Sequence, residues 1–426
     1  MRKIRFIKSL NFLEVFSLGV SLLLGSGIFV IPILAAKASG TLSIISWFIG
    51  AIFSTLVGLC LSELAVKIPR TGGPYAYAHK VFGNEIGFLS GWIFWIAYWM
   101  TTAAETIALS FYINAFLPQL GESSIIIAII CFLFISLINF FGAKLSGEVE
   151  DVLTLFKLLT LVIFIVNGLF VLNPTNFTLH NLSFKSLSAI GSSTFLILFA
   201  YTGFEIVTVP EGEIRNVKKT IRRAIFLSIG VTSIIYILIA IAIVGMTSDY
   251  NYTSLADLAN SILGSKIGTL IALSGLITLL GTINAAVFGC ARISAMMAKD
   301  KVFPEVFNHM NKYAVPDYSL AIQTTLTLLA ILVLRDFEFV ARLSIMLTLV
   351  VYLVSCLAAF KITSPLFERK HVINTRLTPI IASLLCIIIM LQLGIVYWVA
   401  FSSILALGYI IYLIERHRKI KRTSFF

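Results

Sequence analysis

Two short stretches decide the fold: GSGIF at residues 25–29, followed by Pro32, and FAYTGFE at residues 199–205. Each lies in the middle of a long apolar run, where a helical glycine costs about 1 kcal/mol relative to alanine. Such glycines also allow the backbone to leave the helix where the freed polar groups line a cavity. The two stretches therefore predict a pair of helices that are interrupted midway.

The composition around these stretches is that of a membrane protein. Of the 426 residues, 59% are apolar and 12% are charged, and mean hydropathy is +0.99. A soluble globular chain has about 25% charged residues, so an ordinary soluble enzyme is excluded. A membrane-crossing helix needs about 20 apolar residues. The apolar runs predict twelve such helices, at 13–36, 43–66, 88–113, 124–141, 151–172, 187–210, 224–246, 267–297, 318–334, 341–361, 378–395 and 397–414.

The distribution of basic residues predicts the topology. With the N-terminus inside, 26 of the 32 Lys and Arg residues fall in the tails and the even-numbered connections. The positive-inside rule then places both termini in the cytoplasm, in a plasma membrane or in the inner membrane of a Gram-negative host. We interpret the net charge of +12 and the basic runs at 215–223 and 416–422 in the same way. The bilayer, rather than nucleic acid, is the expected partner, and a dedicated lipid or nucleic-acid site is the alternative for these runs.

Cysteine and histidine placement argues against metal chemistry. All five cysteines lie in apolar runs and are expected to be small buried side chains, whereas all five histidines lie outside these runs. We therefore expect no disulfide framework, no intramembrane metal site and no cofactor.

The two predicted interruptions occupy corresponding places in two units of five helices. Because five crossings is an odd number, the second unit enters the membrane from the opposite side. Glycine-interrupted helices in corresponding positions are typical of transporters with inverted repeats. We place the first repeat at 1–172, the second at 173–361, and two further helices with a basic tail at 362–426. The alternative is that the small residues at 25–27 only let two helices pack closely.

An interrupted helix exposes two kinds of backbone group. The start of its second half has free N–H groups and a positive dipole end, which suit a carboxylate. The end of its first half has free carbonyl groups, which suit an ammonium group. An amino acid carries both groups, so the interruptions favour it as the ligand.

Further motifs accompany the two interruptions: SE at 62–63, PRTGGPYAY at 69–77, and RISAMMAKD at 292–300 followed by Pro304. In this order and spacing the chain resembles the amino acid–polyamine–organocation (APC) family over nearly its whole length. The resemblance implies an all-α polytopic fold of the LeuT-like type, with a 5+5 inverted repeat, two extra C-terminal helices, and interrupted helices 1 and 6. The segment at 216–223 departs from the family because it lacks two prolines that are usual there.

The resemblance also implies a set of substrate-binding residues at the two interruptions. The substrate carboxylate would bind backbone N–H groups at 26–28, its ammonium group would bind carbonyls of both interrupted helices, and Phe199 would act as a gate. The residues implied at the interruptions are Leu22, Leu23, Gly25, Ser26, Gly27, Ile28, Phe199, Ala200, Tyr201, Thr202 and Gly203.

We take three charged residues as intramembrane, Lys157, Glu205 and Glu105, and each is a functional candidate because burial of charge in a membrane is costly. The resemblance implies that the Lys157 ammonium takes the place of a sodium ion, which predicts sodium-independent transport. The alternative is that Lys157 extends back to the membrane interface. The resemblance gives Glu205 a role in a cytoplasmic gate and in proton coupling, with a structural hydrogen bond as the alternative.

Glu105 is the residue most informative about the substrate. It shares one face of a predicted helix with Tyr98 and Thr102. A carboxylate that faces the pocket favours a cationic side chain, such as that of arginine, lysine or a polyamine. An ion pair with Lys157 and a buried protonated acid are the alternatives. Tyr75 and Tyr77, in the GGPYAY turn, are expected to help close the cytoplasmic side or to be ordinary interfacial tyrosines.

The sequence thus predicts a secondary active transporter that works by alternating access. We expect sodium-independent transport of cationic amino acids or polyamines, coupled to protons or to exchange. The alternatives are a broad-range neutral amino acid permease and a membrane sensor that binds an amino acid without transporting it. An enzyme is not expected, because the predicted helices contain no metal cluster, nucleophile elbow or paired carboxylates.

Overall fold

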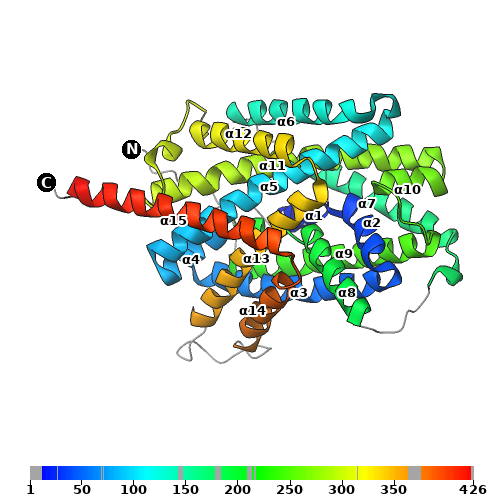
Figure 1. Cartoon of the computed structure of the whole chain (residues 1–426), viewed down its shortest axis with the longest axis horizontal. Helices are drawn as coiled ribbons and strands as arrows, with labels where there is room; N and C mark the ends of the chain where they lie inside the picture. The colour runs from blue at the N-terminus through cyan, green and yellow to red at the C-terminus, as the bar shows by residue number, and fades with distance from the viewer. Residues whose placement is uncertain are drawn as a thin grey trace.

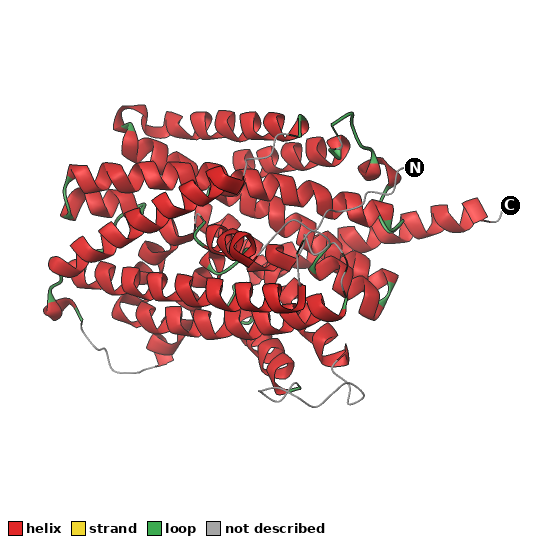
Figure 2. Cartoon of the chain, turned by 180° about the vertical axis from the view of Figure 1, so that it is seen from behind, coloured by secondary structure: helices red, strands yellow, loops and turns green. Residues whose placement is uncertain are grey.

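A computed structural model of the chain is built from helices, as predicted (Figures 1 and 2). The structure describes residues 12–25, 27–68, 70, 72–142, 147–177, 184–208, 214, 217–313, 315–362 and 376–423. The α-helices are α1 (Phe12–Leu23), α2 (Gly27–Ser39), α3 (Ser43–Lys67), α4 (Pro74–Phe82), α5 (Asn84–Phe116), α6 (Ser124–Phe140), α7 (Gly147–Phe170), α8 (Phe184–Ala200), α9 (Val217–Met246), α10 (Leu255–Ile262), α11 (Ser265–Lys299), α12 (Asp317–Leu334), α13 (Phe337–Ile362), α14 (Leu377–Met390) and α15 (Ile395–Thr423). Short 3-10 helices are η1 (Gly40–Leu42), η2 (Pro118–Ser123), η3 (Pro174–Asn176), η4 (Phe204–Thr208) and η6 (Glu305–Asn308).

Every predicted apolar run coincides with a helix or with two helices in succession. Among the described residues, seven segments are long and apolar enough to cross a membrane, and the first, Val15–Lys67, covers most of α1 and all of α2 and α3. Shorter apolar helices occur at Thr154–Phe170, Ser186–Ala200 and Leu377–Met390. Four of the cysteines are buried and Cys131 is half-buried, which agrees with their interpretation as small hydrophobic side chains.

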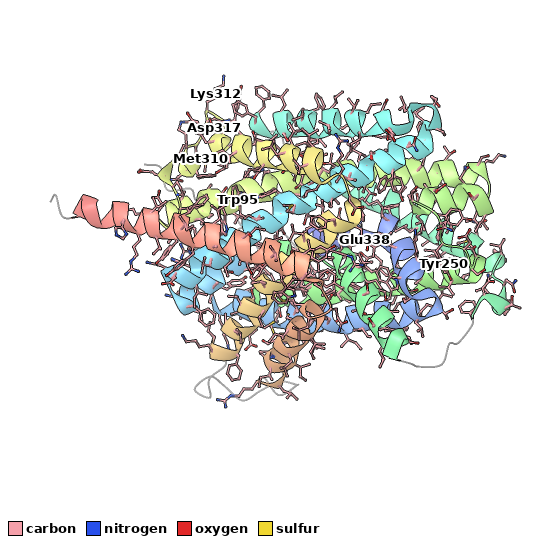
Figure 3. The ribbon with its side chains drawn as sticks, viewed as in Figure 1. Trp95, Tyr250, Met310, Lys312, Asp317 and Glu338 are labelled. Carbon is pink, nitrogen blue, oxygen red and sulfur yellow. The ribbon has the colours of Figure 1, made fainter. Side chains whose placement is uncertain are left out.

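α5 and α11 form the centre of the packing. α5 packs against α11 and α13, while α3 packs against α8 and α9. Both chain ends lie at the left of Figure 1, where α15 projects from the bundle. Figure 3 places Lys312 and Asp317 toward the same end and Tyr250 at the opposite end. The connection between α11 and α12 therefore lies on the side of the termini, as the charge distribution predicts for even-numbered connections.

Two short helices that were not predicted form matching corners in the chain. α4 leads into α5 through Gly83, and α10 leads into α11 through Gly264. These glycines have φ values of +87° and +93°, in the left-handed region that glycine adopts without steric cost. α4 lies at the left of Figure 1 and α10 at the right, so the two corners are at opposite ends of the molecule.

The helices at each corner approach closely at a second glycine. A Cβ atom on Gly87 would lie 2.6 Å from the Cα atom of His79, and one on Gly268 would lie 2.6 Å from the Cα atom of Asn260. In both cases the crowded atom belongs to the backbone, so a larger residue would force the short helix away from the long one. Tyr75 and Tyr77 lie on α4 itself, not in a turn, because Pro74 occupies the first position of that helix.

Candidate functional site

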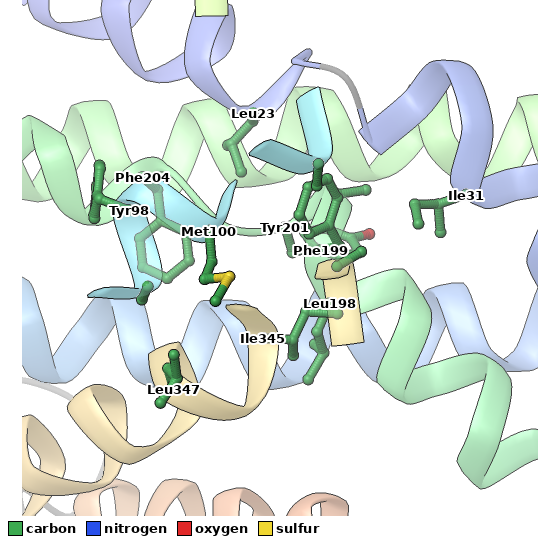
Figure 4. Packing of buried hydrophobic residues seen from close by; sticks show 14 of the residues in the cluster. Leu23, Ile31, Tyr98, Met100, Leu198, Phe199, Tyr201, Phe204, Ile345 and Leu347 are labelled. Atoms are coloured by element: carbon green, nitrogen blue, oxygen red, sulfur yellow. The ribbon is translucent and has the colours of Figure 1, made fainter. Parts of the chain in front are cut away.

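Both predicted helix interruptions are present. α1 ends at Leu23 and α2 begins at Gly27, while α8 ends at Ala200 and η4 begins at Phe204. The two interruptions meet: a Cβ atom on Gly27 would lie 2.4 Å from the Cα atom of Ala200. Figure 4 shows Leu23 and Phe199 in the same part of the core. The glycine therefore lets the two backbones approach closely enough for both to border one space.

That space is a cavity of about 50 Å³. A buried water needs about 10–15 Å³ measured in this way, so the cavity has room for a few waters or a compact solute. It is lined by residues of both interruptions and by three further helices, α5, α11 and α13. The lining residues are Leu22, Leu23, Gly25, Gly27, Tyr98, Thr101, Glu105, Phe199, Thr202, Gly203, Glu205, Thr282, Ala286 and Thr348.

Most of the residues singled out in the sequence are brought together here, including Glu105 and Glu205. Ser26 lies outside the described residues. Ile28, Thr102, Ala200 and Tyr201 are not among the residues that line the cavity.

Tyr201 and Thr102 have other contacts. The Tyr201 hydroxyl is directed toward α3 and α9, where it contacts the Trp47 carbonyl at 3.3 Å and Ser233 Oγ at 3.1 Å. Thr102 donates to the Tyr98 carbonyl of its own helix at 2.9 Å. Thr101 takes its place in the cavity wall.

Four lining residues were not predicted: Thr101, Thr282, Ala286 and Thr348. Thr101 precedes Glu105 by one helical turn, as Thr102 does, so spacing alone does not choose between them. Thr282 and Ala286 also lie one turn apart, on α11. On α11, Ser274, Thr278 and Thr282 recur every four residues and mark a polar face, but the sequence does not tell that this face borders a cavity.

The Glu205 carboxylate joins three elements on one side of the cavity. It accepts hydrogen bonds from the Tyr352 hydroxyl at 2.7 Å, from the Gly203 N–H at 2.9 Å and from the Tyr98 hydroxyl at 3.3 Å. These donors belong to α13, to the second interruption and to α5. Donors of this kind stabilise a negative charge, so they hold Glu205 as a cross-link between the helices.

Tyr236, on α9, was not predicted and lies where the two interruptions meet. Its hydroxyl is within hydrogen-bond reach of the carbonyl oxygens of Leu23 and of Ala200, the latter at 2.9 Å. A hydroxyl has one proton, so it donates to one of these carbonyls at a time. A single side chain therefore lies between the last residues of α1 and of α8 and donates to either.

Lys157 is buried, with 3% of its surface exposed. Its ammonium group donates to Ser21 Oγ on α1 at 3.1 Å. The side chain therefore turns into the protein and contacts the helix that ends at the first interruption. This contact disagrees with extension of Lys157 to the membrane interface.

Charged residues connect α4 to α11 near the end of the molecule that holds the termini. Arg70 Nη2 forms an ion pair with Asp300 Oδ1, and the Tyr75 hydroxyl donates to Asp300 Oδ2 at 2.8 Å. Burial and, next, the Asp300 carboxylate raise the pKa of the Tyr75 hydroxyl above its usual range. Tyr75 thus stays a neutral donor at physiological pH, and we name the Arg70–Tyr75–Asp300 group the α4 latch.

Comparisons with known proteins identify the family. The family model described as "Amino acid permease" matches residues 10–414. The chain belongs to this family. It is 28% identical to the serine/threonine exchanger SteT of Bacillus subtilis, over 87% of both chains. It is 26% identical to the branched-chain amino acid permease BcaP of Lactococcus lactis, over 81% of this chain and 80% of the relative.

A mammalian protein also matches this permease. The large neutral amino acids transporter small subunit 2 of Mus musculus is 28% identical, over 74% of this chain and 62% of the relative. The family and these relatives are transporters, not enzymes. Together with the apolar helices, they identify the permease as a multi-pass membrane protein with an amino acid as substrate.

Aromatic rings lie beyond the cavity on the side of Phe199. The Phe199 ring meets the Phe337 ring edge-on at 5.8 Å, and Phe337 meets Phe111 at 6.2 Å. Phe337 is the first residue of α13 in the permease, so the start of that helix backs the Phe199 side chain. Rings from α8, α13 and α5 therefore close this side of the cavity, whereas Glu205 and two tyrosines cross-link the other helices.

Proposed function

We propose that this permease is a secondary active transporter that moves an amino acid by alternating access around the cavity between its two interrupted helices. The observation that carries this proposal is the close approach of Gly27 to Ala200 beside the cavity. It puts the positive start of α2 and the backbone carbonyls near Leu22 against one small volume. A zwitterion matches both ends.

The substrate-binding residues follow from this arrangement. The substrate carboxylate would bind at the start of α2, at Gly25 and Gly27, with Ser26 and Ile28 contributing backbone N–H groups. The ammonium group would bind the Leu22 carbonyl. The Leu23 and Ala200 carbonyls are within reach of Tyr236. Tyr236 would thus share these acceptors with the substrate.

We propose a small neutral amino acid as the preferred substrate. The cavity of about 50 Å³ suits a compact side chain, and threonines supply much of its polar lining. The named relatives that we compare handle serine and threonine, branched-chain and large neutral amino acids. The second candidate is a cationic amino acid or polyamine, which is favoured by the place of Glu105 in the cavity wall.

We propose that transport is sodium-independent and coupled to exchange or to protons. The support is the buried Lys157 amine, which contacts Ser21 on α1, the helix that ends at the first interruption. Glu205 would act as a gate on the side of the termini, because its carboxylate joins α5, α13 and the second interruption. Both termini would be cytoplasmic, in accord with the positive-inside rule.

We also propose the 5+5 inverted repeat with boundaries near 172 and 361. The matching corners at Gly83 and Gly264 support it, because they lie at opposite ends of the molecule. α2 also packs against α8, α3 against α9, and α5 against α11, which are the helices that the repeat pairs.

The test is uptake into sodium-free proteoliposomes, with labelled serine, alanine, arginine and lysine in parallel, in empty and in preloaded vesicles, with and without an acidic step outside. Serine or alanine uptake without sodium supports the proposal, and a requirement for preloading identifies exchange. Uptake of arginine and lysine that Glu105→Gln abolishes would establish the second candidate instead. Strict sodium dependence, or binding without flux of any amino acid, would contradict the proposal.

A matched pair of variants tests the role of Lys157. Lys157→Ala is expected to lower uptake by at least about tenfold, since loss of a hydrogen bond to a charged group costs about 1.5–3 kcal/mol. Thr160→Val, one turn further along α7, serves as control, because the Thr160 hydroxyl bonds to its own helix at Phe156. Equal uptake by both variants would show that Lys157 has no part in the cycle.

A further inference from the structure

A second hollow lies away from the cavity, between the start of α1 and the first turns of α9. It has a volume of about 640 Å³ and is lined by Phe12, Arg222, Arg223, Phe226 and Leu227. The hollow combines an adjacent pair of arginines with a wall of large apolar side chains. The hollow shares no lining residue with the cavity between the interrupted helices.

The two kinds of side chain are arranged in order along α9. Lys219, Arg222 and Arg223 are exposed on its first turns. They are followed by Phe226 and Leu227, which are 36% and 49% exposed. Further along the same side, Val231 and Ile234 are 36% and 61% exposed. Residues three and four apart share one helix face, so a basic end passes directly into an apolar stripe.

The other wall of the hollow belongs to α1. Phe12 lies in this wall and stacks on Phe16 one turn later, with ring centroids 6.1 Å apart. α1 and α9 approach closely further along, where a Cβ atom on Gly19 would lie 2.9 Å from Ser228 Oγ. The hollow lies between the earlier turns of the two helices, on the basic side.

The apolar stripe of α9 belongs to a membrane-crossing segment, Lys219–Met246. The arginines lie in the first turns of this segment, where a membrane-crossing helix is expected to meet the lipid headgroups. A soluble protein partner or a free anion could bind the arginines but would not cover the apolar stripe of α9. A glycerophospholipid has both parts at this spacing, a phosphate at the interface and an acyl chain below it.

We propose that this hollow is a binding site for one anionic glycerophospholipid, with its phosphate and headgroup at Arg222 and Arg223 and an acyl chain along Phe226, Leu227 and Phe12. Basic side chains at the membrane surface favour anionic over zwitterionic lipid by about fivefold each. Two arginines thus give a preference of about 25-fold. The site lies along α1, the helix whose last residues, Leu22 and Leu23, border the cavity.

The test measures how much lipid stays bound to the purified full-length permease by native mass spectrometry. The lipids are phosphatidylglycerol and phosphatidylcholine with identical acyl chains. The wild-type protein should retain one phosphatidylglycerol with about a 25-fold preference. Arg222→Gln with Arg223→Gln should abolish the preference, whereas the two lysine replacements at the same positions should keep most of it.

Two controls make the result specific. Lys80→Gln with Arg416→Gln removes the same charge from exposed positions on α4 and α15, and should leave the preference unchanged. Glycerol 3-phosphate should not displace the bound lipid, because it has no acyl chain. A wild-type protein without preference, an equal loss in the control pair, or displacement by glycerol 3-phosphate would each overturn the proposal.

Discussion

The two corners of the molecule, α4–α5 and α10–α11, have similar backbone geometry but are stabilised by different polar contacts. Each corner turns at a glycine with positive φ, and each brings a second glycine onto the backbone of the short helix. At the α4 corner, Arg70 and Tyr75 contact Asp300, which directly follows the last residue of α11. At the α10 corner, the fastening is local.

The α10 fastening is a helix cap. Ser254 Oγ accepts from the Asp257 N–H at 3.2 Å, and Asp257 Oδ2 accepts from the Thr253 N–H at 3.1 Å. Such a cap persists when neighbouring helices move, because its partners are four residues apart at most. The α4 latch joins residues 230 positions apart and breaks when α4 and α11 separate. We infer that α4 and α11 separate and come together during transport, whereas the α10 corner keeps its contacts.

The largest effect is expected where the two halves of the chain touch. Gly27→Val should abolish uptake, because even a Cβ atom would lie 2.4 Å from the Ala200 Cα atom, and backbone cannot move aside cheaply. Gly281→Ala on α11 is the control, since it meets nothing within 4 Å. Uptake in proteoliposomes and gel-filtration profiles are measured together. Normal uptake by Gly27→Val would mean that the two interruptions need no close contact.

The corner glycines test whether the two halves are equivalent. Gly87→Ala and Gly268→Ala should each destabilise the fold by about 1–3 kcal/mol, because both would place a Cβ atom 2.6 Å from backbone. Gly289→Ala should not, as its surroundings are open. Thermal unfolding in detergent, followed by tryptophan fluorescence, gives the comparison. If one glycine variant lowered the unfolding temperature strongly and the other did not, the two corners would not be equivalent.

The sequence alone predicts where glycines interrupt a helix and which residues share a helix face. The interruptions at 25–27 and at 202–203 were found because glycines in an apolar run are conspicuous, and period 3.6 placed Tyr98 and Glu105 on one face. The corners could have been found too, since VFGNEIG at 81–87 and ILGSKIG at 262–268 share their glycines at the same spacing. A comparison of the two halves of the sequence predicts these corners, whereas a search for apolar runs does not.

Other features depend on packing that one sequence does not reveal. Thr282 follows Ser274 and Thr278 at four-residue spacing on α11, and Thr348 follows Ser344 on α13, so each helix has a polar face. Tertiary packing alone decides that these faces border the cavity. Tyr201 sits in the predicted motif, yet its hydroxyl turns toward Ser233 because a polar acceptor is available there. The partner of Arg70 is far away in the chain, and no local pattern pairs it with Asp300.

A moderate effect is expected from the α4 latch. Asp300→Asn should weaken closure by about 1 kcal/mol, because the Arg70 side chain is partly exposed and the ion pair is screened there. That corresponds to about fivefold faster amide exchange in α4, with α10 unchanged. Hydrogen–deuterium exchange with mass spectrometry measures both helices in one experiment. Arg70→Gln should have a similar effect, and the double variant should add little to either.

The smallest effect is expected from the cap of α10, and it distinguishes a local fastening from a latch. Asp257→Ala removes the acceptor of the Thr253 N–H and leaves the Ser254 cap in place, and loss of one such hydrogen bond costs about 0.5–1.5 kcal/mol. Exchange should rise at the start of α10 and nowhere else, and sodium chloride should change it little, whereas added salt should loosen the α4 latch. Serine uptake should stay within about twofold of the wild-type value. If Asp257→Ala instead raised exchange in α4, the two corners would be coupled, and the α10 end would have to move with the α4 end during transport.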